Sequence, residues 1–265
     1  MDPIALLLVL AAAGFHAAWN LSLHGTGDRV MSMAVASIVG GLILSPGIWF
    51  WPPWEAWPWL LPSVAAQVAY ALALAGAYER GALSFAYPVG RGTAPLLVTF
   101  GGWVLLTQVP TVDDVLGAVA LIAGLLVLTR RAVQANQLSS VGFALLTGCS
   151  IATYSVVDAA AVATVSPVGY LAVVQLGSGL ALLALLRPGR ARSRGSLAVG
   201  ARIGVGQVSA YLLVLFAFQR ATAGSVATLR ELSVVIALLV ARERPGWPTW
   251  VGVGLCVAGA GLAVW

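Results

Sequence analysis

Two arginines, Arg91 and Arg230, lie inside apolar segments of the sequence, where a permanent charge requires water or a partner. Arg91 is roughly ten residues into segment 82–106, which is close to mid-depth for a membrane-spanning helix rising ~1.5 Å per residue. Pro88 and Pro95 bracket it and predict a kinked helix. A guanidinium at that depth can hold a carboxylate or phosphate through paired hydrogen bonds. The alternative is an internal ion pair that locks helices together.

Polar residues also recur at helical spacing. His16 and Asn20 share one face of an apolar segment, and Tyr154 and Asp158 repeat the i, i+4 spacing in another. Such faces predict a cavity wall, whereas the alternative is hydrogen bonding that only joins helices, which applies equally to Asn20 and the glutamines. We predict as substrate-binding residues Arg91, Arg230, Tyr87, His16, Asn20, Tyr154, Gln67 and Gln207.

Three ionisable residues are candidates for coupling transport to protons, because acids and histidines inside a span mark proton pathways. They are Asp158, Glu231 and His16. Glu231 follows Arg230 directly, and adjacent helical residues point about 100° apart, so these two do not face each other.

The elements that position these residues are membrane spans. The chain has 265 residues, of which 60% are hydrophobic and 9% charged, values typical of an integral membrane protein. A span needs roughly 20 apolar residues. Ten segments fit: 4–23, 30–50, 59–78, 82–106, 115–129, 141–163, 167–186, 198–219, 224–241 and 250–265. The proline- and tryptophan-rich stretch 51–59 is predicted to be an interfacial loop.

An internal repeat organises the spans. Gln67 recurs as Gln207 at an offset of 140, Arg91 as Arg230 at 139, and His16 as Tyr154 at 138. Spans one to five therefore correspond to six to ten, and an odd number of spans per copy inverts the second copy. The predicted fold is an all-α integral membrane protein with ten transmembrane helices in two inverted five-helix repeats. Residues 1–131 form the first repeat, 132–140 a connecting loop and 141–265 the second repeat.

Small residues predict a contact between the halves. Gly117 and Gly124 match Gly252 and Gly259 at an offset of 135, and each pair is spaced seven residues apart. Such stripes let helix backbones approach closely. We predict a packing seam inside the molecule, with a dimer contact as the alternative.

Arginine placement predicts the orientation. All 14 basic residues are Arg, and eleven fall in the odd-numbered connections or their edges, against Arg220 alone in the even ones. By the positive-inside rule, the odd connections face the cytoplasm and both termini lie outside. The arginines flank spans instead of forming a recognition face, so the net charge of +5 does not indicate nucleic-acid binding.

Motifs for other functions are absent from the sequence. There is no metalloprotease, nucleophile-elbow, Walker or dinucleotide motif, and Cys149 and Cys256 have no spacing that suggests a metal site or disulfide framework. We predict no enzyme activity, no metal and no cofactor.

Three runs resemble the EamA-type branch of the drug/metabolite transporter superfamily. They are residues 16–20 (HAAWN), 79–95 (ERGALSFAYPVGRGTAP) and 230–235 (RELSVV). The resemblance implies ten helices around a cavity lined mostly by the third, fourth, eighth and ninth helices, and transport of small metabolites, often amino-acid export and frequently proton-linked. The chain departs from the family pattern between Arg230 and Glu243, where it is about four or five residues shorter, in agreement with the fall in repeat offset from 139 to 135. The predicted external placement of both termini also differs from the better-known members of that family, in which the termini are cytoplasmic.

We therefore predict a secondary transporter of a small anionic or zwitterionic metabolite in the cell inner (cytoplasmic) membrane, working by alternating access. Its partners would be the small-molecule substrate, protons and the lipid bilayer. Two alternatives stay open: an exporter of cationic or hydrophobic drug-like compounds, and a non-transporting membrane scaffold subunit. The substrate, the coupling ion, the flux direction and the choice between monomer and homodimer are open.

Overall fold

A computed structural model describes residues 1–24, 26–80, 83–133, 138–186, 194–233, 235–236 and 247–263. Within these ranges, the side chains of residues 24, 78–80, 83–92, 128–133, 138–141, 194–196 and 249 lie outside the description. The described backbone is all-helical. Its elements are α1 (Pro3–His24), α2 (Arg29–Leu44), α3 (Pro46–Phe50), the short 3-10 helix η1 (Trp54–Ala56), α4 (Trp57–Arg80), α5 (Leu83–Leu106), α6 (Val112–Val133), α7 (Leu138–Val162), α8 (Pro167–Leu185), α9 (Arg194–Phe218), α10 (Ala223–Arg230) and α12 (Trp247–Leu262).

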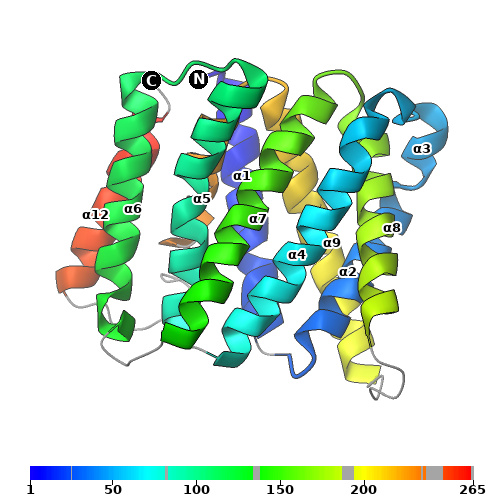
Figure 1. The fold of residues 1–265 in the computed structure, drawn as a ribbon, viewed down its shortest axis with the longest axis horizontal. Helices are drawn as coiled ribbons and strands as arrows, with labels where there is room; N and C mark the ends of the chain where they lie inside the picture. Colours follow the sequence, from blue (N-terminus) through cyan, green and yellow to red (C-terminus); the bar gives the residue numbers. More distant parts are fainter. Residues whose placement is uncertain are drawn as a thin grey trace.

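The long helices stand side by side, and the start of α1 lies on the same face as the end of α12 (Figure 1). The extensive contacts join elements that are far apart in sequence. α1 packs against α9, α4 against α7, α2 against α8 and α9, and α6 against α12. The two halves of the chain are therefore interleaved instead of forming separate bundles.

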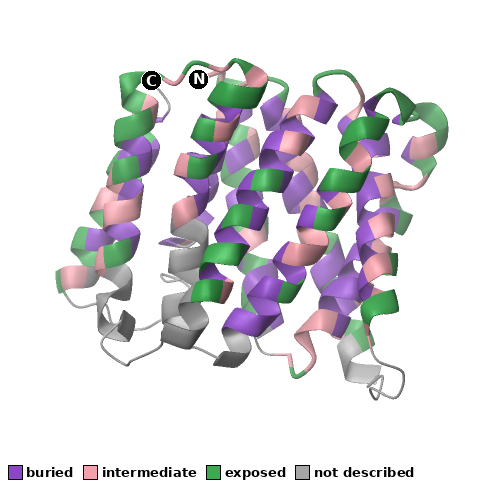
Figure 2. Cartoon of the chain, viewed as in Figure 1, coloured by how far each residue is buried: buried purple, intermediate pink, exposed green. Residues whose placement is uncertain are grey.

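Several helices have the length and apolarity needed to cross a membrane. Five reach a full span: Pro3–Leu23, Trp54–Ala77, Gly142–Val162, Pro167–Leu185 and Leu197–Phe218. Three shorter apolar helices cover Arg29–Leu44, Thr93–Leu106 and Trp250–Leu262. Their outer surfaces carry exposed residues while buried residues face inward (Figure 2), and large apolar side chains such as Leu7 and Leu61 are among the exposed ones. The chain is a multi-pass membrane protein.

Two predicted spans are interrupted. The segment 30–50 divides at Ser45 into α2 and α3, because Pro46 has no N–H for the preceding turn but suits the first position of a new helix. The tryptophans that follow in the chain are exposed, and the exposed fraction of Trp57 is 72%.

The predicted span 224–241 is interrupted after Arg230, and the described residues 232–233 and 235–236 are helical again. α10 ends at Arg230, where the Glu231 N–H bonds the Thr228 carbonyl at 3.2 Å in a tightened last turn. No glycine or proline occurs between Arg230 and Pro245, so no local sequence signal marks this end. Residues 237–246 lie outside the description.

α6 begins earlier than the predicted segment 115–129 because a reciprocal cap fixes its first turn. The Thr111 N–H donates to Asp114 Oδ2 at 2.9 Å, and the Asp114 N–H donates to Thr111 Oγ1 at 3.1 Å. Ser225 Oγ donates to Asp114 Oδ1 at 2.8 Å. The start of α6 is thereby tied to the start of α10.

The glycine stripes form an internal seam, as predicted. A Cβ added at Gly117 would lie 2.7 Å from the Gly259 carbonyl oxygen, and one added at Gly124 would lie 2.7 Å from that of Gly252. Only glycine allows α6 and α12 to approach this closely. The seam therefore joins the last helix of one half to the last helix of the other.

Candidate functional site

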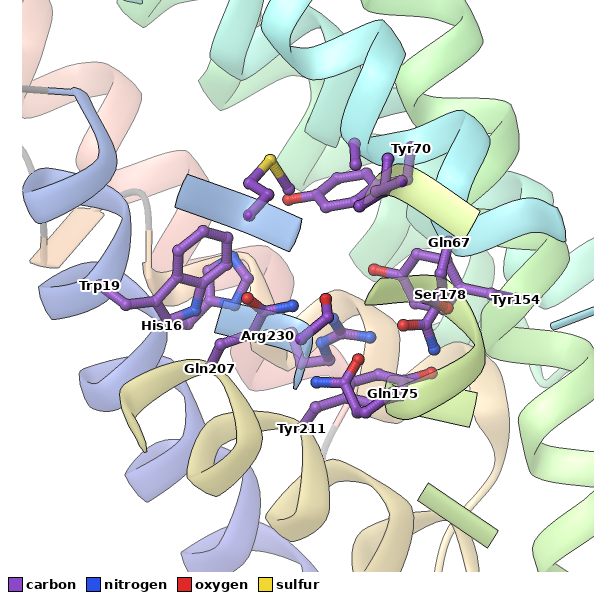
Figure 3. A pocket seen from close by; sticks show the side chains of 14 residues that line it. His16, Trp19, Gln67, Tyr70, Tyr154, Gln175, Ser178, Gln207, Tyr211 and Arg230 are labelled. Atoms are coloured by element: carbon purple, nitrogen blue, oxygen red, sulfur yellow. The ribbon is translucent and has the colours of Figure 1, made fainter. Parts of the chain in front are cut away.

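A central pocket is enclosed by helices from both halves of the chain. It offers about 40 Å³ to the centres of water molecules, enough for a few waters in this conformation. Side chains from α1, α4, α7, α8 and α9 surround the opening together with Arg230 (Figure 3). The lining comprises His16, Trp19, Met33, Ser37, Gln67, Tyr70, Ala71, Tyr154, Gln175, Ser178, Leu182, Gln207, Tyr211 and Arg230.

Several residues predicted from the sequence meet here. His16, Gln67, Tyr154, Gln207 and Arg230 all line the pocket. The remaining predicted residues lie elsewhere or outside the description, and they are treated one by one below.

Asn20 does not line the pocket. Its Nδ2 donates to the His16 carbonyl one turn earlier at 2.9 Å, so its amide is used within α1. The side chains of Tyr87 and Arg91 lie outside the described residues. The described part of α5, Thr93–Leu106, contributes nothing to the lining, although the family resemblance had suggested this helix as a main wall.

Arg230 brings a guanidinium into the pocket from the last residue of α10. Its side chain is 5% exposed, and its Nη1 donates to Ser155 Oγ at 3.4 Å. The guanidinium carbon also lies 5.4 Å from the centre of the Tyr211 ring, within the range of a cation–π contact. Among the described residues, these two contacts are made with neutral groups, and they orient the guanidinium toward the pocket.

Asp158 lies directly behind the pocket wall and is fully buried. Tyr170 Oη donates to its Oδ1 at 2.7 Å, and Tyr211 Oη donates to its Oδ2. Both carboxylate oxygens are thus satisfied, as a buried acid requires. Because Tyr211 also lines the pocket, it links Asp158 to the cavity.

Glu231, the other predicted acid, is 3% exposed and does not line the pocket. It follows Arg230 at the end of α10, where its backbone N–H closes the last turn.

Aromatic rings form a chain along the pocket wall. Tyr154 packs edge-to-face with Tyr70 on one side and Tyr211 on the other, with ring centres 5.9 Å and 5.4 Å apart. His16 makes a similar contact with Trp19 at 4.8 Å. Ring edges and faces therefore fix the width of the cavity.

A second, smaller cavity adjoins the first and shares His16, Tyr211 and Arg230 with it. Its other lining residues include Ala12 on α1 and Val214 on α9. Ala12 precedes His16 on a helix that begins at the face bearing the chain ends, and Val214 follows Tyr211 on a helix that runs toward that face. The smaller cavity thus lies on the side of the termini, and the three shared residues line both spaces.

Sequence reasoning missed Tyr211, Gln175 and Ser178 as pocket residues. A signal existed for the first, because Tyr211 is four residues after Gln207 and so lies on the same helix face. Gln175 and Ser178 are three residues apart on α8, but the hydrophobicity of that helix gives no sign of which face points inward.

Polar atoms without partners are concentrated at this pocket. Among the described residues, five buried side-chain atoms that line it form no hydrogen bond: Trp19 Nε1, Gln67 Nε2, Gln175 Oε1, Ser178 Oγ and Gln207 Oε1. A buried polar group without a partner is costly, so such a cluster is typical of a ligand or water site.

Comparisons with known proteins give a family match for the second half of the chain and a likeness of fold for nearly all of it. Residues 138–265 match the model described as the EamA-like transporter family. A solved structure entitled "Crystal structure of protein" is 18% identical, has a TM-score of 0.78 and aligns over 98% of each chain, a likeness that concerns the fold alone. No curated protein matches the sequence.

Proposed function

We propose that this chain, a member of the EamA-like transporter family within the drug/metabolite transporter superfamily, moves a small anionic or zwitterionic metabolite by alternating access. The observation that carries the proposal is the buried guanidinium of Arg230 in a pocket that both halves enclose. An arginine inside a membrane protein is expensive unless it meets a partner, and a substrate carboxylate is a matched one.

The inverted repeat is supported by the way in which paired positions meet. His16 and Tyr154 both line the pocket, as do Gln67 and Gln207, although each pair is 138 or 140 residues apart. Helix packing follows the same relation, since the contact of α4 with α7 corresponds to that of α9 with α1. We infer ten spans in two inverted five-helix repeats, with the substrate site near their pseudo-two-fold axis.

The shared residues of the two cavities suggest where alternation occurs. His16, Tyr211 and Arg230 line both the larger cavity and the smaller one on the side of the termini. A solute bound at Arg230 would be released to one side or the other as the two halves rock against each other. In this mechanism Arg230 remains at the centre in both states.

Proton coupling is assigned to Asp158 first. Its carboxylate bonds Tyr211, whose ring faces Arg230, so protonation of Asp158 and binding of an anion at Arg230 act on the same tyrosine. His16, which lines both cavities, is the second candidate. Glu231 ranks below them because it does not line the pocket.

We also propose residence in the cytoplasmic membrane with both termini outside the cytoplasm. The support is the count of arginines by connection, eleven against one. A reporter fused after Trp265 that functions only in the cytoplasm would reverse this orientation.

The test of function is uptake into proteoliposomes. Purified protein is reconstituted and offered amino acids, hydroxy acids and other small carboxylates, with and without a pH gradient. We expect Arg230→Gln to raise KM for a transported carboxylate by on the order of 30-fold or more, since a buried charge pair is lost. Arg230→Lys should recover part of the affinity as a point charge.

Arg220→Gln is the matched control. The Arg220 side chain is 49% exposed, pairs with Asp2 at 3.4 Å and does not line the pocket. An unchanged KM in Arg230→Gln, with normal yield and melting temperature, would refute an anion-holding role. Arg91→Ala belongs in the same series, because its role is inferred from the repeat alone.

A further inference from the structure

We infer that the transported solute is a small monocarboxylate carrying a neutral amide, and that Gln175 and Ser178, with Gln207, form the subsite that binds the amide. This inference rests on the proposed function, because it takes the carboxylate to be held by Arg230. It adds a second recognition element that neither the family match nor the sequence motifs provide.

Two residues of the proposed amide subsite lie on α8. Gln175 and Ser178 are three residues apart, so both side chains lie on the same face of the helix, and both line the pocket. Gln175 is 1% exposed and Ser178 is 2% exposed. Their Oε1 and Oγ atoms have no hydrogen-bond partner. Two nearly fully buried polar atoms thus face a cavity with their hydrogen-bonding capacity unused.

Gln207 extends the subsite from α9. Its Oε1 also has no partner, and it lines the same cavity. Figure 3 shows the side chains of Gln175, Gln207 and Arg230 converging on one opening. A short solute that places its carboxylate at Arg230 therefore brings its other end among the glutamines.

The available hydrogen-bonding groups decide the chemistry of that other end. A glutamine amide presents an NH2 group that donates and a carbonyl oxygen that accepts, and a serine hydroxyl can act as either. A ligand amide has the complementary N–H and C=O. A carboxylate only accepts, so it would leave glutamine oxygens unpaired, and an alkyl group would leave every atom of the subsite unpaired.

Water is the competing occupant, since the cavity admits a few water molecules and water also satisfies both donors and acceptors. The two cases differ in selectivity. A site built for an amide rejects an alkyl analogue of the same shape, whereas a water-filled space accepts any carboxylate that fits.

The experiment compares three probes of similar size in proteoliposomes: succinamate, succinate and 4-methylpentanoate. The last two replace the terminal amide by a carboxylate and by an isopropyl group. We expect kcat/KM for succinamate to exceed that of each analogue by at least about tenfold. The wild-type protein is first shown to be folded by its melting temperature in detergent.

Two variants then test which side chains cause the preference for succinamate. Gln175→Met keeps the length of the side chain but removes the amide, and Ser178→Ala removes the hydroxyl. Both should lower the preference for succinamate over 4-methylpentanoate by about tenfold, while uptake of 4-methylpentanoate is kept or improved. A purely structural role would reduce the uptake of all probes together.

Ser32→Ala is the matched control for Ser178→Ala. Ser32 is also fully buried with a hydroxyl that has no partner, but it does not line the pocket. The selectivity of Ser32→Ala should equal that of the wild type.

The outcomes are distinct. Equal transport of succinamate and 4-methylpentanoate overturns the amide subsite but leaves carboxylate transport standing. Selectivity that survives in Gln175→Met and Ser178→Ala overturns the assignment of these residues. Failure of the folded protein to move any of the three probes or the carboxylates of the wider panel overturns the proposed function, and the inference with it.

Discussion

The two halves of the chain contribute unequal chemistry to one pocket. In the second half, Asp158 lies buried behind the wall and receives hydrogen bonds from Tyr170 and Tyr211. At the corresponding place in the first half, Asn20 donates to the His16 carbonyl of its own helix. The positions related to Tyr170 and Tyr211 by the repeat offsets of 138 and 140 are Ser32 and Ala71.

The difference shows that the two proposed repeats do not contribute equal chemistry to the site. Interleaved packing and the glycine seam involve both halves, because α1 packs against α9, α4 against α7 and α6 against α12. The described ionisable network, in contrast, belongs to the second half, with His16 as the first half's contribution to the pocket. We expect transport chemistry to be far more sensitive to changes in the second half, while stability depends on both.

The largest effect is predicted for Asp158→Asn. Neutralising this acid should reduce uptake to a rate that no longer responds to a pH gradient, because the amide cannot bind and release a proton. Proteoliposome uptake with an imposed gradient measures this. The repeat-related Asn20→Ala should retain gradient-driven accumulation, and a gradient response in Asp158→Asn would contradict our assignment.

A smaller loss is predicted for Tyr211→Phe. The variant keeps the ring over Arg230 but removes one donor to Asp158. Because hydrogen bonds to charged groups contribute about 1.5–3 kcal/mol, we expect gradient-driven uptake to fall roughly tenfold.

Tyr170→Phe sharpens this prediction. It removes the other donor to Asp158 from a residue that does not line the pocket. The pH response should weaken without a change in the KM for substrate. Identical kinetic effects of the two variants would mean that Tyr211 has no special link to the cavity.

Substitution of a seam glycine should lower the stability of the protein by a similar amount whether the glycine lies on α6 or on α12. Gly124→Val and Gly259→Val each place a side chain against backbone of the facing helix, so each should destabilise the protein by about 1–3 kcal/mol or more. Melting curves in detergent measure the effect. Gly261→Val, where an added Cβ meets nothing within 4 Å, is the control, and a tolerant Gly124 would break the symmetry of the seam.

The smallest effect is predicted for Arg220→Gln. The Arg220 side chain is exposed and that of Asp2 is partly exposed, so loss of the pair should cost less than about 1 kcal/mol, and the cost should be smaller still in salt. Thermal unfolding at low and high salt checks this, and a shift comparable to that of the glycine variants would show a larger structural role.

Much of the framework could be predicted from the sequence because apolar length, arginine placement and repeated residues are local signals. The apolar segments, the close approach of the glycine stripes and the meeting of His16, Gln67, Tyr154, Gln207 and Arg230 all followed from spacing. The end of α10 after Arg230 did not, since its residues carry no helix-breaking signal.

The sequence by itself determined that this is a multi-pass helical membrane protein with a buried arginine that requires a partner. Only the tertiary structure decided which helix faces form the pocket. Tyr170, Tyr211, Gln175 and Ser178 gain their roles from helices that pack across the molecule, and in apolar helices neither face is marked by hydrophobicity. That choice depends on shape complementarity between distant segments, which spacing along one helix does not encode.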